Sequence, residues 1–487
     1  MRRLAAQGVR VTGLAVNSRT LAAGEVFLAY PGAHQDGRDF IPQALARGAA
    51  AVLWERGGYR WNDSWRVPNL DIQDLRMLAG YLAHEVYGRP SEKLWTIGVT
   101  GTNGKTSSSQ WIAQACSDSG ARTAVLGTLG TGFPGELDAS LNTAADPVTL
   151  HRSLARLLAA GAQGVSLEVT SIGLDQGRVN GVAFGAALFT NLSRDHLDYH
   201  HDMESYARAK QRLFETPGLI HAVLNLDDVQ GVRLARMLAE RGVNRAGFSC
   251  FEGVALRAGL ERYAEAHSIE MSHAGIAFTV KSSWGEARIA APLLGRFNVS
   301  NLLGVLTTML VSGVPFDRAT TALACLRPVA GRMQRIGGAG KPLVVVDYAH
   351  SPDALEKTLV ALRDVANADG GRLVAVFGCG GDRDRGKRPL MGAVASRHAD
   401  RVVVTSDNPR GENPAAIIAE IVAGMPGRYE AIEDRRGAIA YAIANAAAED
   451  VVLLAGKGHE TYQEISGERL PFSDAEEAEK ALERWSA

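Results

Sequence analysis

A glycine-rich segment at residues 98–106 reads GVTGTNGKT and follows directly on an apolar run. Glycines let backbone N–H groups converge on an anion, and a helix that begins at such a loop adds the positive end of its dipole. In this arrangement Lys105 reaches the terminal phosphates of a nucleotide, and the Thr106 hydroxyl binds Mg²⁺. The strict pattern has glycine in place of Val99, so we interpret the segment as a shortened phosphate-binding loop. The alternative, a glycine-rich turn with a solvated lysine, is disfavoured by the strand–loop–helix context.

A carboxylate at the end of a second apolar run is suited to the same chemistry. Glu168 lies near the end of the run at 164–169, and Mg²⁺ prefers a few hard oxygen ligands. On its own, a glutamate at a strand end is more often solvated or a helix cap. The segment NLSRDHLDYHH at 191–201 contains His196, but no cysteine or HExxH spacing supports zinc. Lys210, considered alone, has the pattern of a solvated surface charge.

The last third of the chain repeats a strand–loop–helix pattern. Four β-branched runs are each followed by a polar loop: 343–347 by YAHSP, 373–377 by GCGGDRDRGKR, 402–405 by SDNPR and 451–455 by GKGHE. This alternation predicts a parallel, doubly wound sheet with ligands at the carboxyl ends of its strands. The charged run at 380–388 is either an anion-binding loop or a solvated surface. The DNPR segment is either a turn or a binding loop, and the turn leaves Arg410 unexplained.

These patterns predict an α/β protein of three domains. We expect a small N-terminal α/β domain at 1–90, a central domain that contains the glycine loop at 91–328, and the doubly wound domain at 329–487. A chain of 487 residues is long enough for two to four domains. The last helix is expected to bury one face, which consists of Ala478, Ala481, Leu482 and Trp485.

Charge and cysteine content exclude several classes of protein. Lys plus Arg total 52 and Asp plus Glu total 53, so no positive excess indicates a nucleic-acid or anionic-membrane partner. The four cysteines lie far apart without a CxxC pair, which fits a reducing compartment. The N-terminal residues are too polar for a signal peptide, and the longest apolar stretch, 182–189, is well short of the roughly 20 residues that span a bilayer. We expect a soluble, cytoplasmic protein without membrane insertion.

Eight segments in this order resemble motifs of the Mur ligase family: GTNGKT at 101–106, NLSRDHLDYH at 191–200, GRFNVSN at 295–301, GRM at 331–333, DYAHSPDALE at 347–356, FGCGGDRDRGKRP at 377–389, DNPR at 407–410 and GKGHE at 456–460. More narrowly, the chain is similar to the branch of the family that adds diaminopimelate, from the N-terminal domain to the last strand. The resemblance implies an N-terminal domain for a UDP moiety, a central P-loop ATPase domain, and a C-terminal Rossmann-like domain for the incoming amino acid.

The resemblance also implies a reaction. An ATP-dependent ligase of this branch adds meso-2,6-diaminopimelate to the D-glutamate γ-carboxylate of UDP-N-acetylmuramoyl-L-alanyl-D-glutamate through an acyl phosphate, in peptidoglycan precursor synthesis. The implied catalytic residues are Lys105, Lys210 and His196, with Lys210 carbamylated. The implied Mg²⁺ ligands are Thr106, Glu168, His196 and the carbamate of Lys210. ATP is then the co-substrate and Mg²⁺ the cofactor, the partners are the two small-molecule substrates, and the expected state is a monomer.

The resemblance carries three sets of binding residues over to this sequence. The ATP set is Gly101, Thr102, Asn103, Gly104, Lys105, Thr106, Ser107, Asn298, Asn301, Arg332 and Asp347. The set for the UDP-linked substrate is Val16, Ser18, His34, Gln35, Asp36, Asn142, Thr143, Ala144, Ser171, Gln176 and Arg178. The diaminopimelate set is Arg383, Asp407, Asn408, Pro409, Arg410, Gly456 and Glu460. Relatives commonly read NTTP or NTTG where this chain has NTAA, and SSH where it has TSI, so Ala144 lacks a hydroxyl and Ile172 an imidazole.

Other hypotheses differ in substrate or in class of protein. A lysine-adding enzyme or a folylpolyglutamate synthase-like ligase would share the ATPase core, but the first 90 residues and the DNPR loop disfavour both. A P-loop regulatory or partner-binding ATPase would need only residues 94–327 and would leave the four C-terminal loops unexplained.

Overall fold

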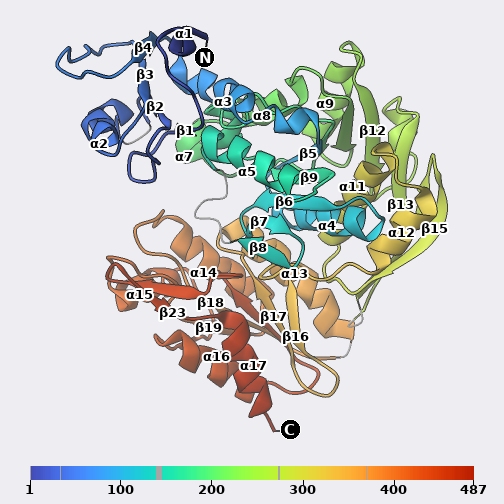
Figure 1. Ribbon diagram of the computed structural model, residues 1–487. Helices are drawn as coiled ribbons and strands as arrows, with labels where there is room; N and C mark the ends of the chain where they lie inside the picture. Colours follow the sequence, from blue (N-terminus) through green and yellow to red (C-terminus); the bar gives the residue numbers. More distant parts are fainter. Residues whose placement is uncertain (1, 33–34, 139–144, 273–274, 369, 487) are drawn as a thin grey trace. The chain divides into compact units, whose positions relative to one another are not determined.

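The computed structural model describes residues 2–32, 35–138, 145–272, 275–368 and 370–486 (Figure 1). The chain divides into two compact units, each made of three segments. The first contains Met1–Glu265, Lys281–Gly285 and Asn301–Ala322, and the second contains Ala266–Val280, Glu286–Ser300 and Leu323–Ala487. None of the helices in the described ranges combines the length and the apolar composition that crossing a bilayer requires.

The N-terminal part of the first unit is a four-stranded parallel sheet in the order β1-β2-β3-β4. Its elements are α1 (Arg2–Ala6), β1 (Leu14–Ala15), β2 (Val26–Ala29), η1 (Gly37–Phe40), α2 (Ile41–Ala46), β3 (Ala51–Glu55), β4 (Asn69–Ile72), α3 (Leu75–Val86) and η2 (Pro90–Glu92). Alternate residues of a strand point to opposite faces, so Val26 and Leu28 pack with α3, whereas Phe27 and Ala29 pack with α2.

An eleven-stranded sheet follows, in the order β15-β14-β13-β12-β11-β10-β5-β9-β6-β7-β8. Its strands are β5 (Trp95–Thr100), β6 (Thr123–Gly127), β7 (Gly130–Phe133), β8 (Glu136–Asp138), β9 (Gly164–Glu168), β10 (Ala186–Phe189), β11 (His221–Asn225), β12 (Asn244–Ser249), β13 (Arg262–Ser272), β14 (Gly275–Ser282) and β15 (Gly285–Ala291). The helices of this part of the chain are α4 (Lys105–Asp118), α5 (Pro147–Ala159), α6 (Ser171–Asp175), α7 (Leu197–His200), α8 (Met203–Gln211), η3 (Arg212–Glu215), α9 (Val229–Ala239), α10 (Val254–Arg257), α11 (Phe297–Val311) and α12 (Phe316–Ala324).

The expected strand–loop–helix around the glycine loop is confirmed. β5 is buried along almost its whole length and leads directly into the loop, and α4 begins at Lys105. Four residues that recur at helical spacing in the sequence are buried in α4: Trp111, Ile112, Ala115 and Cys116. Because β9 pairs with β5 in parallel, with Glu168 opposite Val99, the carboxyl ends of the two strands meet at one edge of the sheet.

The second unit contains a six-stranded sheet in the order β16-β17-β21-β18-β19-β20, in which only β16 is antiparallel. Its elements are β16 (Gln334–Gly337), β17 (Leu343–Asp347), α13 (Pro352–Ala368), β18 (Leu373–Phe377), α14 (Lys387–His398), β19 (Arg401–Val404), α15 (Pro414–Val422), β20 (Glu430–Ala431), α16 (Arg435–Ala444), β21 (Val451–Ala455), β22 (Tyr462–Ile465), β23 (Glu468–Pro471) and α17 (Asp474–Glu483).

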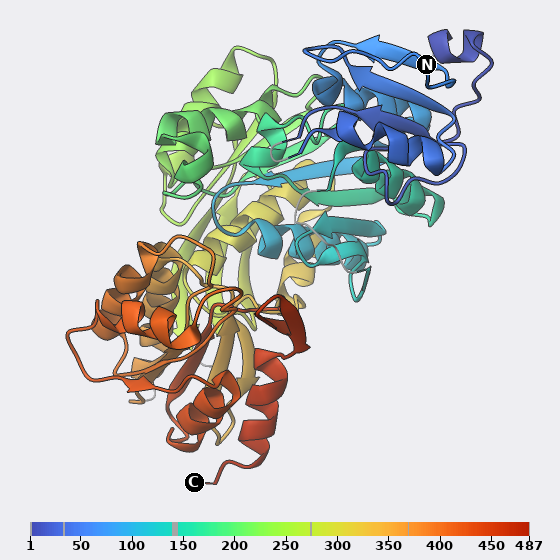
Figure 2. The ribbon, with the colours of Figure 1, turned by 90° about the vertical axis from the view of Figure 1, so that its left-hand side faces the viewer.

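Helices cover both faces of this sheet (Figure 2). Leu343 and Val345 of β17 pack with α13, α14 and α15, whereas Val344 and Val346 pack with α16 and α17. The predicted doubly wound sheet is therefore confirmed, and β17, β18 and β21 begin and end where the β-branched runs do. The last helix buries Ala478 and Leu482, as expected, whereas Ala481 is only partly buried and Trp485 lies beyond the end of α17. The domain boundaries at residues 90 and 328 stay predictions.

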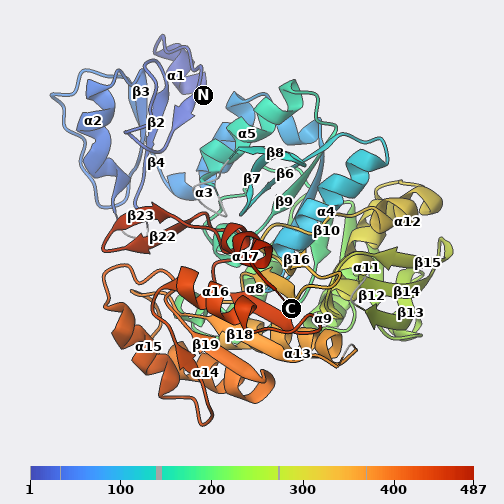
Figure 3. The same ribbon diagram turned by 90° about the horizontal axis from the view of Figure 1, so that it is seen from below.

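A fully buried ion pair joins α16 and α17. Figure 3 labels these two helices. Arg435 at the start of α16 donates to both carboxylate oxygens of Asp474 at the start of α17, at 2.7 and 2.6 Å. The same guanidinium donates to the carbonyl oxygens of Ser406 and Ala455, at 3.4 and 3.0 Å. Those carbonyls lie at the starts of the loops after β19 and β21, so the ion pair attaches both loops to the helical layer.

We predict that Arg435→Met lowers the free energy of unfolding by about 3–5 kcal/mol, because it leaves the Asp474 carboxylate buried without its partner. The double variant Arg435→Met/Asp474→Leu removes both charges and should recover most of that loss. Urea denaturation followed by tryptophan fluorescence measures both effects. An equal loss in the single and the double variant would show that packing, rather than the unpaired charge, dominates.

Candidate functional site

The glycine loop and Glu168 lie together at the carboxyl ends of β5 and β9. The Thr106 hydroxyl donates to Oε2 of Glu168 at 3.0 Å, and the Thr128 hydroxyl donates to the same oxygen at 3.1 Å. The backbone N–H of Thr128 donates to Oε1 at 2.9 Å. Gly127 leaves the space for this carboxylate, because a Cβ there would lie 2.1 Å from Oε1. Three donors thus hold the buried Glu168 side chain in one orientation beside Thr106.

Two glycines give the loop its backbone path. Gly101 and Gly104 have φ values of 149° and 83°, which side chains with a Cβ rarely adopt. A Cβ on Gly101 would lie 1.9 Å from Thr190 Oγ1, and one on Gly104 would lie 2.4 Å from Asn301 Oδ1. Asn301 therefore lies directly against the loop, as expected for the ATP set. Asn103 is held there as well, since its backbone N–H donates to Asn191 Oδ1 at 2.9 Å.

Two lysine amines converge on one carbonyl of the loop. Lys105 Nζ donates to the Gly101 oxygen at 3.1 Å and to the Thr102 oxygen at 2.8 Å, and Lys210 Nζ donates to the Gly101 oxygen at 2.6 Å. Burial of Lys210, reinforced by the charge of Lys105, lowers the pKa of its amine well below the ordinary value. The interpretation of Lys210 as a solvated surface charge is wrong, because its side chain is buried.

Tyr206 connects Lys210 and His196 to the loop. Its ring lies 4.5 Å from Lys210 Nζ, and its hydroxyl lies 3.1 Å from Thr102 Oγ1. The ring of His196 lies 6.3 Å from the same tyrosine ring, and His196 has a positive φ of 53°. The structure thus brings the three expected catalytic residues to one side of the glycine loop.

The donor atoms at this position suit Mg²⁺. The Thr106 hydroxyl and the Glu168 carboxylate are hard oxygen donors that lie 3.0 Å apart. Within the described ranges no group of three or more His, Cys, Asp or Glu is placed to hold a metal. A protein that offers few oxygens fits an ion that takes its other ligands from phosphate and water. The Lys210 amine is not a ligand for such an ion unless it becomes a carbamate.

The N-terminal sheet carries a cavity of about 290 Å³. Its lining includes Val16, Ser18 and Gln35 from the set expected for the UDP-linked substrate, and it adds Tyr30 and Phe40, which the sequence analysis missed. An aromatic lining with a few polar groups is typical of small-molecule sites. His34, Asn142, Thr143 and Ala144 lie outside the described residues.

Asp36 belongs to the same expected set and is held by Arg38. The Arg38 guanidinium donates to both Asp36 carboxylate oxygens, at 2.9, 3.0 and 2.6 Å. Hydrogen bonding to Arg38 holds the pKa of the Asp36 carboxyl below its ordinary value. Arg38 also donates to the carbonyl oxygens of Glu55 and Gly57. The carboxylate is therefore ionised and fixed relative to β3.

The remaining expected UDP-substrate residues lie on α6 or just after its end and are hydrogen-bonded with residues of α7 or with one another. Arg178 donates to Gln176 Oε1 at 3.0 and 2.8 Å, and Gln176 Nε2 donates to the Tyr199 hydroxyl at 3.2 Å. The Ser171 hydroxyl lies 2.9 Å from His200 Nε2. This chain therefore places an imidazole beside Ser171 from α7, although Ile172 lacks the one that relatives commonly have there.

The second unit contains the rest of the ATP set. Asp347, at the end of β17, accepts from the Met333 N–H at 2.8 Å and from the Thr358 hydroxyl at 3.3 Å. Burial raises the pKa of the Asp347 carboxyl. The Arg332 guanidinium lies over the Tyr348 ring, 4.7 Å from its centroid. Asn298 on α11 donates to the Leu294 oxygen at 2.7 Å.

The expected diaminopimelate residues gather at the carboxyl ends of β18, β19 and β21. Arg410 Nη1 donates to the Gly381 oxygen at 2.9 Å, and its Nε lies 3.6 Å from Glu464 Oε2. A Cβ on Gly380 would lie 2.8 Å from Arg410 Nη1 and 3.8 Å from Arg383 Cγ, so both arginines flank that glycine.

The loop after β21 completes this group. A Cβ on Gly456 would lie 2.4 Å from Asp407 Oδ2, and Asn408 Nδ2 donates to Glu460 Oε2 at 2.8 Å. The Pro409 carbonyl lies where a Cβ on Gly381 would be. A guanidinium and a carboxylate in adjacent loops are suited to a ligand that carries both a carboxylate and an ammonium group.

The sequence analysis missed several residues that support these sites. Lys457 lies in the quoted segment GKGHE and Thr128 lies in none of the quoted segments, and nothing in the spacing distinguishes either residue. Arg388 is another example: it is fully buried and donates to Glu412 and Glu420 from within the charged run. Only burial identifies this arginine, so that run is not simply a solvated surface.

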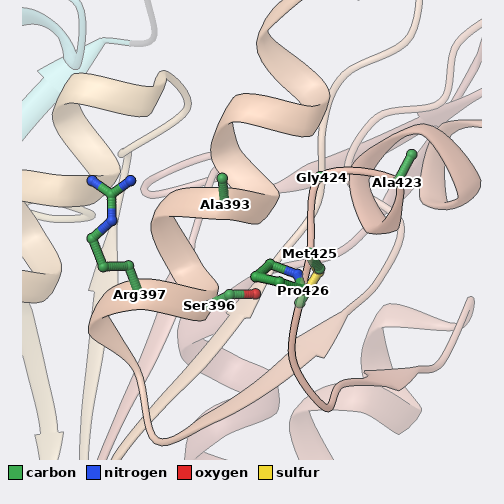
Figure 4. A pocket seen from close by; sticks show the side chains of 7 residues that line it. All are labelled: Ala393, Ser396, Arg397, Ala423, Gly424, Met425 and Pro426. Carbon is green, nitrogen blue, oxygen red and sulfur yellow. The ribbon is translucent and has the colours of Figure 1, made fainter.

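A larger cavity of about 540 Å³ lies elsewhere in the second unit, between α14 and the segment after α15 (Figure 4). Figure 4 labels its lining residues, among which Ser396 and Arg397 have polar side chains. No residue of the expected sets is among them. This cavity does not contribute to the candidate site.

Three family models match consecutive parts of the chain. Residues 10–87 match the Mur ligase family, catalytic domain; residues 99–309 match the Mur ligase middle domain; and residues 331–458 match the Mur ligase, glutamate ligase domain. The chain is also similar over nearly its full length to proteins named UDP-N-acetylmuramoyl-L-alanyl-D-glutamate–2,6-diaminopimelate ligase. One from Chromobacterium violaceum is 49% identical, and the match covers 98% of this chain and 95% of that protein. One from Pseudomonas aeruginosa is 50% identical, and the match covers 97% of this chain and 95% of that protein.

Solved structures are similar to this chain as well. A structure of UDP-N-acetylmuramoyl-L-alanyl-D-glutamate–2,6-diaminopimelate ligase matches with a TM-score of 0.70 and 37% identity, over 97% of this chain and 95% of that one. The MurF structure from Acinetobacter baumannii matches with a TM-score of 0.64 at 19% identity, over 92% and 90% of the two chains, which shows the shared fold alone.

We predict that the thiol of Cys379, which directly precedes the charged run at 380–388, is unreactive. Burial raises the pKa of Cys379 and of Cys116 to about 12, so at pH 8 almost none of either thiol is ionised, and thiolate is the reactive form. Cys325 is exposed. Iodoacetamide at pH 8 should therefore alkylate Cys325 first in the folded protein, and peptide mass spectrometry should find Cys116 and Cys379 unmodified. Early alkylation of Cys379 would contradict this burial.

Proposed function

The chain belongs to the Mur ligase family, and we propose that it joins meso-2,6-diaminopimelate to the D-glutamate γ-carboxylate of UDP-N-acetylmuramoyl-L-alanyl-D-glutamate at the expense of ATP. The observation that carries this proposal is the 49–50% identity, over nearly the full length, to proteins named for that activity. The amino-acid preference has separate support in the loops after β19 and β21, where Arg410 and Glu460 offer one cation and one anion.

In the proposed reaction the γ-carboxylate attacks the ATP γ-phosphorus, and ADP leaves as an acyl phosphate forms. The amine of diaminopimelate then attacks the acyl carbon, loses a proton, and displaces phosphate as the amide forms. Lys105 is suited to meet the β- and γ-phosphates, where negative charge develops. Bound Mg²⁺, which we propose Thr106, Glu168, His196 and the Lys210 carbamate hold, would neutralise phosphoryl charge.

The contacts of the N-terminal cavity support its assignment to the UDP-linked substrate. Val16, Ser18 and Gln35 line it, and Asp36 is an ionised acceptor beside it. Ser171, Gln176 and Arg178 supply a hydroxyl, an amide and a guanidinium. Burial raises the pKa of the Tyr30 hydroxyl at this cavity, and the charge of Arg178 opposes that shift, which is consistent with one extended ligand for both groups of residues.

We further propose that the protein acts as a cytoplasmic monomer. The proposed co-substrates, ATP and a nucleotide-linked dipeptide, are cytoplasmic metabolites.

ADP release tests the function directly. The purified protein with ATP, Mg²⁺ and the UDP-linked dipeptide should release ADP in step with amide formation when meso-diaminopimelate is added, and far less with other amino acids in a panel. Lys105→Ala is the inactive reference, since the loss of one donor to developing charge costs on the order of 10²–10³ in rate. ADP release that does not depend on both substrates would favour an ATPase of another class.

We predict that Lys210 carries a carbamate. Its lowered pKa leaves neutral amine, the form that combines with CO₂, and Lys210→Ala should lose activity. High bicarbonate or a short carboxylate such as acetate should restore part of it by supplying oxygen ligands. Mass spectrometry at mild pH should find the carbamate on Lys210 and none on Lys357, which is half exposed on α13. Full activity of Lys210→Ala without rescue would contradict the prediction.

We predict that Arg410 selects diaminopimelate over lysine. The Arg410 side chain is only 21% exposed. A ligand without the distal carboxylate would leave its guanidinium with only the Gly381 carbonyl and Glu464 as partners, at a cost of about 2–5 kcal/mol. Values of kcat/KM for both amino acids should therefore differ widely in the wild type and much less in Arg410→Ala. Arg397→Ala, at an exposed position on α14, is the matched control. Equal use of lysine by the wild type, or an unchanged preference in Arg410→Ala, would reject this assignment.

A further inference from the structure

Lys457 is a charged side chain in the second unit that the proposed reaction does not use. It lies between Gly456 and Gly458, whose φ values are 116° and 54°. A Cβ on Gly456 would collide with Asp407 Oδ2, at 2.4 Å, and one on Gly458 with Tyr348 Cβ, at 2.8 Å. These glycines let the chain turn closely against its neighbours, and the lysine between them enters the interior. Its side chain is 0% exposed.

Three groups surround the buried ammonium. Lys457 Nζ donates to Asn408 Oδ1 at 3.0 Å and to Glu460 Oε2 at 3.0 Å. The Tyr462 ring centroid lies 5.7 Å away, within the range of a cation–π contact. A turn brings the lysine and the glutamate together, because the Glu460 N–H donates to the Lys457 carbonyl at 3.0 Å. A buried ammonium requires such pairing.

These contacts determine which way the Asn408 amide points. Its Oδ1 accepts from Lys457 Nζ and from the Glu464 N–H, at 3.0 and 2.9 Å. An amide oxygen accepts and an amide nitrogen donates, so Nδ2 must be on the other side, where it donates to Glu460 Oε2 at 2.8 Å. The reverse orientation would direct N–H groups at two other donors.

The same contacts determine how Glu460 presents its carboxylate. Oε2 receives hydrogen bonds from both Lys457 and Asn408, whereas Oε1 has no hydrogen bond with any of the described residues. The Glu460 side chain is 17% exposed. One oxygen is thus held inside the protein, and the other remains for a ligand.

We infer that Lys457 is a positioning residue: it holds Glu460 and Asn408 so that Glu460 Oε1 receives the distal ammonium of the amino-acid substrate. The inference rests on the proposed function and deepens it, because it assigns the preference for an amino acid with a second amine to a residue that does not touch the substrate. Without Lys457, Glu460 loses one of the two donors that orient it, and Asn408 loses one of the two that fix its amide.

The experiment compares two amino acids in Lys457→Met. Diaminopimelate has the distal amine, and 2-aminopimelate lacks it but keeps both carboxylates and the attacking amine. The wild type should prefer diaminopimelate, and Lys457→Met should reduce the ratio of the two kcat/KM values about tenfold to a hundredfold, the usual effect of losing a hydrogen bond to a charged group. The lower ratio should arise from a higher KM for diaminopimelate, while KM for ATP and for the dipeptide stays within about twofold of the wild-type value.

Lys480→Met is the matched control, because Lys480 pairs with Glu477 three residues away, at 2.9 Å, but is 54% exposed. It should leave every constant unchanged. If Lys457→Met lowers kcat/KM equally for both amino acids, or leaves their ratio unchanged, the inference is overturned, since a general disturbance of the fold affects both substrates alike.

Glu460→Gln keeps the test decisive if Lys457→Met does not fold. That variant alone should lose the preference, and adding Lys457→Met to it should change the ratio no further, because the two residues act through one contact. The double variant has no unpaired buried charge and is expected to fold. A retained preference in Glu460→Gln, or a further change in the double variant, would overturn the inference. Failure of the proposed function is seen separately, as a wild type that releases no ADP in response to diaminopimelate.

Discussion

Parallel pairing of buried strands is the constraint on which the candidate sites depend. A strand that lies between parallel neighbours has its carboxyl end at the same edge as theirs, so the loops that follow must meet there. In the first unit this brings Glu168, at the end of β9, beside the glycine loop after β5. In the second unit the loops after β18, β19 and β21 meet in the same way.

Charges that this arrangement buries are paired, and the pairs organise the loops. Arg435 with Asp474 attaches the loops after β19 and β21 to the helices. Arg388 donates to Glu412 and Glu420, and also to the Gly380 carbonyl at 3.3 Å in the loop after β18. Replacing such a pair by apolar residues is often neutral for stability. We therefore infer that these pairs serve to fix the positions of the loops rather than to raise the free energy of unfolding.

The sheets and the loops differ in how much they depend on the exact sequence. The MurF structure shares the fold at 19% identity, so the layers tolerate wide changes in sequence. In the proposed function, a few side chains decide what the loops present to the amino acid, Arg410 and Glu460 foremost, together with the buried residues that orient them. Specificity can then change without any change in the sheet.

The sequence by itself determined the features that depend on neighbours in the chain. Glycines 101 and 104 allow the loop, the apolar spacing of 111–116 forms the buried face of α4, and β-branched runs form β17, β18 and β21, because each depends on local backbone freedom and on burial on both faces. Only tertiary structure decided that Lys105 and Lys210 share the Gly101 carbonyl, that Thr128 orients Glu168, and that Lys457 is buried. Those contacts join segments that are distant along the chain, and the direction of a side chain there is determined by strand order and packing, which spacing does not record.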